Sequence, residues 1–196
     1  MTSKPLRADA QRNRTALLAT ARELFDAGHS DLRFDDFARL AGVGVGTLYR
    51  HFPTREALAE AVYGREVSDL CEHARQLQAT LPAKQALAAF LRSMVSHIQA
   101  HPGLAHTLAT LIASRPDALA EGSRALEKTV TDLLEAAVRD GAVRPDVGAG
   151  AVMMALHGIS AARNQPGWQA HSYGVITLVM DGLSHSSQDS SEQEPR

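Results

Sequence analysis

The chain has 196 residues, of which 44% are hydrophobic and 21% charged, with a net charge of −2 and one cysteine. This composition is typical of a globular protein that buries a core, and the single Cys71 excludes an internal disulfide. No apolar run approaches the length of a membrane span and no signal-peptide pattern opens the chain. We therefore expect a protein of the reducing cytoplasm.

Charge is distributed unevenly along the chain. Residues 1–55 hold nine Lys and Arg against six Asp and Glu, whereas residues 56–196 hold eleven against sixteen. A basic segment joined to an acidic one favours a nucleic-acid-facing domain attached to a second domain. An excess of three positive charges is also compatible with chance, so charge alone does not carry the assignment.

The expected elements are all helices. Residues 1–9 show no apolar period and are expected to be flexible, and a helix then covers about 9–27 and ends at Gly28. After residue 53, apolar stripes interrupted by Pro and Gly predict helices over 54–78, 83–100, 102–113, 117–140, 146–164 and 169–184. No alternation of period two occurs, so the fold class is all-α. Residues 185–196 are rich in Ser, Gln and Glu, which predicts a disordered tail.

The stretch from Phe34 to Leu58 predicts two short helices at a tight turn, followed by the start of a long third helix. The first helix carries apolar residues at the i, i+3, i+4, i+7 spacing of one face, namely Phe34, Phe37, Ala38 and Ala41. Gly42 then stands where a helix ends in a left-handed residue. The second helix covers about 45–51, Pro53 stops it, and Thr54 is a good N-cap for the third. This pattern is a helix-turn-helix.

The same stretch resembles the DNA-binding signature of the TetR/AcrR family of one-component transcriptional regulators. The resemblance lies in Ala-Gly-Val, in Gly-Thr-Leu-Tyr-x-His-Phe, and in a basic residue three positions after that Phe. It covers about a quarter of the chain in sequence detail and the rest in helical layout. It implies a DNA-binding domain over residues 1–55, an effector-binding and dimerising bundle over 56–184, and an inverted-repeat operator in double-stranded DNA.

Individual DNA contacts follow from the resemblance. It implies that Thr47 and Arg50 contact base edges or the groove, and that Tyr49, His51 and Arg55 hold phosphates. Gly46 permits close approach of the backbone to the duplex, and Val45 offers an apolar contact where many relatives carry a polar residue. The alternatives are core packing of the Tyr49 ring and an internal hydrogen bond of His51.

Arg33 departs from the family pattern. It stands where a Thr or Ser normally caps the second helix, so a side-chain cap is expected to be missing. Asp35 and Asp36 would then compensate at the helix N-terminus, and Arg33 would be placed to reach a phosphate.

Other chemistry is weakly supported. His97 and His101 have the i, i+4 spacing that holds a metal, but no His-Glu-x-x-His order accompanies them, so polar residues lining a cavity or surface are favoured over a metal site. Nothing near Cys71 favours a thiolate. No nucleophile motif, phosphate-binding glycine loop or dinucleotide fingerprint is present, so we expect neither an enzyme nor a cofactor.

The last two helices predict an interface. Residues 147–183 are crowded with small and apolar residues, which indicates burial against a second copy of the chain, or alternatively within one large core. By resemblance, a small and apolar effector would bind among the middle helices, lined by Leu91, Met94, Val95, His97, Leu108 and Ile112. The favoured function is a homodimeric repressor that an effector releases from DNA. The alternatives are a ligand-independent DNA-binding protein and a helical-bundle enzyme that carries a helix-turn-helix.

Overall fold

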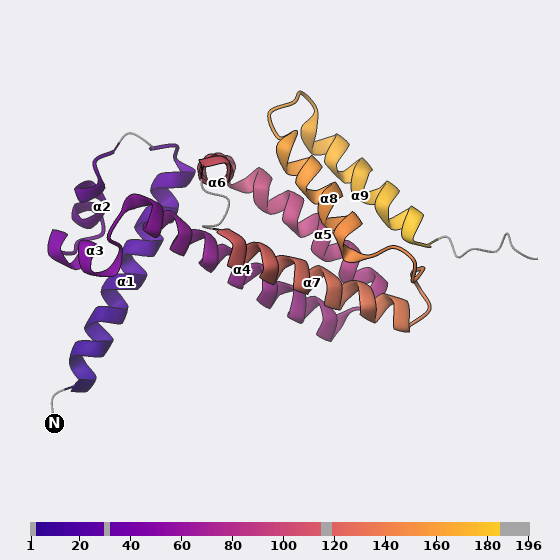
Figure 1. Cartoon of the computed structure of the whole chain (residues 1–196), viewed down its shortest axis with the longest axis horizontal. Helices are drawn as coiled ribbons and strands as arrows, with labels where there is room; N and C mark the ends of the chain where they lie inside the picture. Colours follow the sequence, from indigo (N-terminus) through magenta and orange to yellow (C-terminus); the bar gives the residue numbers. More distant parts are fainter. Residues whose placement is uncertain (1–2, 30–31, 115–118, 185–196) are drawn as a thin grey trace, which may run out of the picture. The chain divides into compact units, whose positions relative to one another are not determined.

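The computed structural model describes residues 3–29, 32–114 and 119–184, with side chains for all of these except 3–7, 108, 109 and 111–114. Within those ranges the chain forms helices and no strand (Figure 1). The helices are α1 (Ser3–Asp26), α2 (Phe34–Leu40), α3 (Val45–His51), α4 (Arg55–Thr80), α5 (Ala83–Ala100), α6 (Pro102–Ser114), α7 (Ala120–Arg139), α8 (Ala149–Ala161) and α9 (Trp168–Ser184). The all-α prediction is confirmed. The expected tail, 185–196, lies outside the described residues.

The start of α1 corrects one expectation. The sequence predicted a flexible segment over residues 1–9, whereas the helix already begins at Ser3. Polar residues without an apolar stripe can extend a helix that packing has nucleated further along the chain, because each added residue costs little once the first turn exists. Pro5 is compatible with this, since the first turn of a helix leaves its backbone N–H groups without intrahelical acceptors.

The chain divides into two compact units. One comprises Met1–Ser68 and His101–Gly122, and the other comprises Asp69–Ala100 and Ser123–Arg196. The long helix α4 contributes its first part to one unit and its second part to the other. The functional boundary expected near residue 55 stays a prediction.

The first unit is built on a core shared by α1, α2, α3 and the first part of α4. Its fully buried side chains include Leu17, Phe25, Phe37, Leu48 and Leu58. Helix α6 packs on α1 so closely that a Cβ at Gly103 would overlap the backbone carbonyl of Asp26. The two short helices are therefore held from behind by a continuous apolar core.

The second unit places α5 against α8 and α9, which lie side by side (Figure 1). Its buried residues include Phe90, Val130, Leu133, Leu156 and Ile176. The indole N–H of Trp168, at the start of α9, donates to the carbonyl oxygen of Ile159 near the end of α8 at 2.6 Å. In neither unit do the described residues include a helix long and apolar enough to cross a membrane.

Candidate DNA-binding surface

The turn between α2 and α3 has a defined backbone geometry. Gly42 has φ +68°, and its N–H donates to the carbonyl oxygen of Arg39 at 3.2 Å. The N–H of Val43 donates to the carbonyl oxygen of Ala38 at 2.9 Å. This pair of bonds is a Schellman motif, which satisfies the last carbonyls of α2 and requires a residue that tolerates positive φ. The predicted role of Gly42 as the end of the first helix is confirmed.

Helix α3 has one buried face and one exposed face. Leu48 is fully buried, and so is Phe52, which follows the helix. The opposite face exposes Gly46 and Arg50 to solvent, with Thr47 half-buried beside them, and Val45 is exposed in the first turn of the helix. The structure thus brings the sequence-predicted groove contacts together on one exposed surface, and their contact with DNA stays a prediction.

Arg55 lies in the first turn of α4. The hydroxyl of Thr54 accepts a hydrogen bond from the backbone N–H of Ala57 at 3.2 Å, so Thr54 caps the helix as predicted. The guanidinium carbon of Arg55 lies 5.2 Å from the ring centroid of Phe37, within the range of a cation–π contact. Arg14 of α1 lies 5.3 Å from the ring centroid of Phe52 in the same manner. Two arginines are thus held against aromatic rings of the core.

The start of α2 lacks a side-chain cap from Arg33, as the sequence predicted, because a guanidinium has no acceptor. Asp36 instead makes the N3 bond of a capping box, a more direct contact than electrostatic compensation. Its carboxylate accepts the backbone N–H of Arg33 at 3.0 Å and pairs with Arg39 at 2.7 Å.

Tyr49 makes a contact that the sequence did not predict. Its hydroxyl donates to the carboxylate of Asp35 at 2.9 Å, and its ring lies edge-on to Phe34 at 5.3 Å between centroids. The hydrogen bond to Asp35, then slight desolvation and the charge of Asp35, raise the pKa of the Tyr49 phenol. The residue is 48% exposed, so Tyr49 lies at the surface and not in the core. His51 is half-buried, with its ring 6.2 Å from that of Phe52.

The predicted effector residues lie in two helices of different compact units. On α5, Leu91 and Val95 are fully buried, and Met94 and His97 are half-buried. Leu108 and Ile112 belong to α6, and their side chains lie outside the described residues. The shared cavity expected from the resemblance stays a prediction.

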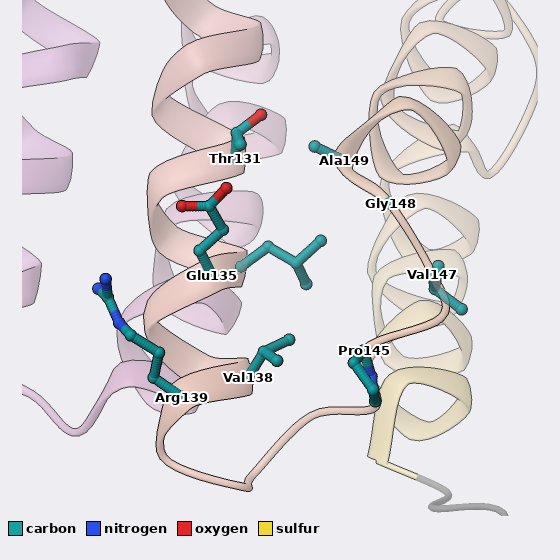
Figure 2. A pocket seen from close by; sticks show the side chains of 9 residues that line it. Thr131, Glu135, Val138, Arg139, Pro145, Val147, Gly148 and Ala149 are labelled. Atoms are coloured by element: carbon teal, nitrogen blue, oxygen red, sulfur yellow. The ribbon is translucent and has the colours of Figure 1, made fainter.

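The described residues form hollows elsewhere, among them two in the second unit. The larger, about 390 Å³, lies between α7 and the segment that leads into α8. Figure 2 shows Thr131 and Val138 on α7 and Val147 and Ala149 opposite them, while the side chain of Arg139 extends away from that loop. The smaller, about 240 Å³, is lined by Ser123 and Glu127 of α7 and by Gly150, Met153, Met154 and His157 of α8. None of the predicted effector residues lines either hollow.

Helices α8 and α9 leave apolar side chains in solvent. Met154 is 74% exposed and Leu178 is 72% exposed, while the other faces of the two helices bury Leu156 and Ile176. A Cβ at Gly158 would meet no neighbouring atom, so this side of α8 is open.

His101 belongs to a polar network that the sequence did not reveal. Its Nδ1 lies 2.8 Å from a carboxylate oxygen of Asp26 and its Nε2 lies 2.9 Å from a guanidinium nitrogen of Arg22, which in turn pairs with Glu66. No group of three or more His, Cys, Asp or Glu side chains that could hold a metal occurs in the described part of the chain. These partners lie 44 to 79 residues apart in sequence, so no local pattern could have found them.

Known families match both parts of the chain. Residues 17–62 match the bacterial regulatory proteins of the tetR family, and residues 82–185 match the SbtR-like transcriptional regulator C-terminal domain. Helix-turn-helix-type transcriptional regulators of Staphylococcus aureus are 38% identical over 66 residues and 34% over 74. These matches span 33% and 37% of this chain, and the chain spans only 35% and 40% of the length of those curated relatives.

Two solved structures resemble the chain over nearly its whole length. A TetR transcriptional regulator from Streptomyces coelicolor is 37% identical with a TM-score of 0.68, covering 89% of this chain and 99% of that one. A TetR transcription regulatory protein from Mycobacterium vanbaalenii is also 37% identical, with a TM-score of 0.66, covering 92% and 100%. With the helix-turn-helix geometry and the family match to more than half of the sequence, these likenesses show that the chain belongs to the TetR family of transcriptional regulators.

Proposed function

We propose that the protein is a homodimeric DNA-binding regulator, a repressor that a small molecule releases from its operator. The observation that carries the proposal is the exposed face of α3. Gly46 and Arg50 are exposed on the side of α3 away from Leu48, which anchors the helix in the core, and Val45 is exposed in its first turn. A helix presented in this way fits the major groove, where base edges are distinguishable.

The charged residues around α3 support two kinds of DNA contact. Arg50 lies among exposed groups on the groove-facing side and is proposed to read base edges together with Thr47. Arg55 lies at the N-terminus of a long helix, where free N–H groups favour an anion, and is proposed to hold a phosphate with His51. Arg33, exposed beside α2, is proposed to add a second phosphate contact.

The proposed dimer uses α8 and α9. Met154 and Leu178 expose large apolar areas that a monomer would leave in water, and burying them against a second copy is favourable. Two-fold symmetry would then match an inverted-repeat operator with half-sites about one helical turn apart.

An effector is proposed for the middle helices. A transcriptional regulator from Bacillus subtilis with a TM-score of 0.69 was solved in complex with stearoyl-CoA, but at 15% identity that likeness is of fold alone. It supports a ligand site within this fold. We propose action by binding and not by catalysis, in the cytoplasm where the DNA is.

The test begins with selection of DNA. The full chain is incubated with genomic fragments, bound fragments are sequenced, and the best site is titrated in a fluorescence anisotropy assay against a scrambled duplex of equal length. The proposal expects a symmetric site bound at least about 1,000-fold more tightly than the scrambled one. Equal affinity for both duplexes, or a site with one asymmetric half, would contradict it.

A thermal-shift screen of metabolites then separates the ligand-responsive regulator from a ligand-independent one. A true effector at 100 times its Kd stabilises the folded protein by about 2.7 kcal/mol and weakens operator binding. Compounds that stabilise the protein but leave DNA binding unchanged would favour the ligand-independent alternative. Turnover of a stabilising compound would favour the enzyme.

A further inference from the structure

Two adjacent carboxylates at the start of α2 have different partners. Asp36 stays within its own segment, accepting the backbone N–H of Arg33 and pairing with Arg39. Asp35 instead accepts the hydroxyl proton of Tyr49, which lies on α3 and 14 residues along the chain. The bond between Asp35 and Tyr49 therefore joins the two helices of the motif directly.

The Tyr49 hydroxyl has one proton. In donating it to Asp35 at 2.9 Å, the hydroxyl keeps only acceptor capacity. Phosphate oxygens are also acceptors, so the hydroxyl in this arrangement offers a phosphate nothing to bind. The negative charge of Asp35 also lies beside the hydroxyl, and the positive charge of Arg33 offsets part of it.

Contacts of the Tyr49 ring add to this link between α2 and α3. The ring lies edge-on to Phe34 at 5.3 Å, and Phe34 packs in turn against buried Phe37 at 6.1 Å between centroids. The side chain is thus fixed at both ends, by Phe34 along the ring and by Asp35 at the hydroxyl. A side chain held in this way restrains the angle between α2 and α3.

We propose that Tyr49 and Asp35 form a positioning pair that orients α3, the helix proposed to enter the major groove, and that the Tyr49 hydroxyl does not itself hold a DNA phosphate. The proposal rests on the DNA-binding function proposed above. It assigns Asp35 a role in DNA binding that requires no contact with DNA. The consequence is specific to orientation: the pair determines how well Thr47 and Arg50 meet their bases, and random DNA, which needs no exact fit, is bound as before.

A double-variant cycle on the full chain tests the pair. Tyr49→Phe removes the proton, Asp35→Ala removes the acceptor, and Asp35→Asn keeps an acceptor without the charge. For a single hydrogen bond to a charged group, each of the first two variants should weaken cognate binding by about 10-fold while random-duplex affinity stays within about 2-fold. The double variant should be no weaker than either single one, and Asp35→Asn should recover most of the affinity.

The opposite result is equally defined. If Tyr49 holds a phosphate, Tyr49→Phe weakens cognate and random DNA alike, and it does so equally in the Asp35→Ala background. Asp35→Ala alone would then strengthen binding, because it frees the hydroxyl and removes a negative charge. Additive losses in the cycle would overturn the positioning pair.

Two controls keep these outcomes separate. Unfolding curves for each variant give the folded fraction, and affinities are compared per folded molecule. A variant that only loses stability would then keep the wild-type ratio of cognate to random affinity, and this result would overturn the proposal. If wild-type protein bound every DNA no more tightly than a scrambled duplex, the DNA-binding function itself would be refuted. If wild-type protein binds its cognate site but the losses in the cycle are additive, only the positioning pair is refuted.

Discussion

The Nε of Arg22 on α1 donates to the carboxylate of Glu66 on α4 at 2.6 Å. Glu66 is buried, with 8% of its side chain exposed, whereas the Arg22 side chain is one-third exposed. Arg22 also reaches Nε2 of His101, and because a guanidinium only donates, this contact places the ring proton on Nδ1, facing Asp26. One arginine thus connects groups from α1, α4 and the residue before α6.

Arg22→Ala should therefore be costly. It leaves the buried Glu66 without its guanidinium partner, and we expect a loss of about 2–3 kcal/mol in the free energy of unfolding, somewhat below a fully buried pair because Arg22 is partly solvated. The matched control is Arg39→Ala, which removes the more exposed pair with Asp36 and should cost under about 1 kcal/mol. Urea unfolding measures both, and similar losses would mean that burial of Glu66 does not matter.

Gly103 should tolerate no side chain. A Cβ there would overlap the carbonyl of Asp26, so Gly103→Ala must separate α6 from α1 and should destabilise by about 1–3 kcal/mol. Gly64 on α4 has no neighbour near its missing Cβ, and Gly64→Ala should stabilise by about 0.5–1 kcal/mol through helix propensity. A thermal melt in which Gly103→Ala is as stable as wild type would contradict the close packing of α6 on α1.

Charged substitutions on α8 and α9 test the proposed dimer interface. Leu178→Arg and Gly158→Arg place a cation on the exposed faces of α9 and α8 without disturbing the protomer, because both positions are open in the described structure. Burial of an unpaired charge in a dimer is strongly unfavourable, so both variants should be monomers. Light scattering gives the mass, with Gln85→Arg on the exposed side of α5 as the control that should stay dimeric. Dimers of both interface variants would require another interface.

Substitutions at Arg50 and Arg55 should distinguish a base contact from a phosphate contact. Arg50→Ala should cost about 1–3 kcal/mol on the cognate site and much less on random DNA, since a base contact exists only in the specific complex. Arg55→Ala should weaken both and reduce the log–log salt slope by about one. Titrations at several salt concentrations measure both effects. Equal weakening of both duplexes by Arg50→Ala would make Arg50 another phosphate contact.

The Tyr49–Asp35 bond should make the free energy of unfolding depend on pH in the alkaline range, even in the absence of DNA. Asp35 raises the pKa of the Tyr49 phenol, so the folded chain binds this proton more tightly than the unfolded chain, whose phenol titrates near pH ~10. The contribution is fully present below about pH 10 and is lost as the pH rises through the folded-state pKa. The stability difference between wild type and Tyr49→Phe should therefore shrink above about pH 10. Urea unfolding between about pH 8 and 11.5 checks this, and a constant difference would deny the bond.

Local sequence signals were enough to predict the local structure. Gly42 and Gly28 both adopt positive φ where the pattern ended a helix, and the helices predicted over 45–51 and 83–100 have those bounds in the structure. Such signals work because a glycine in the left-handed region or a proline acts within one turn of the backbone. The face of α3 that is buried was also predictable, because Leu48 and Phe52 share one side of a helix.

Which polar groups meet could not be predicted from local sequence and depends on how the helices pack. Asp35 looked like one of two equivalent acidic residues at a helix start, and only the packing of α2 on α3 brought it to Tyr49 and left Asp36 to cap. For His101 the sequence favoured a polar residue lining a cavity or surface, and only its approach to α1 gave it Asp26 and Arg22 as partners. The reason is physical: a hydrogen bond needs its atoms within about 3 Å, and for residues far apart in sequence the packing of the helices, not local spacing, sets that distance.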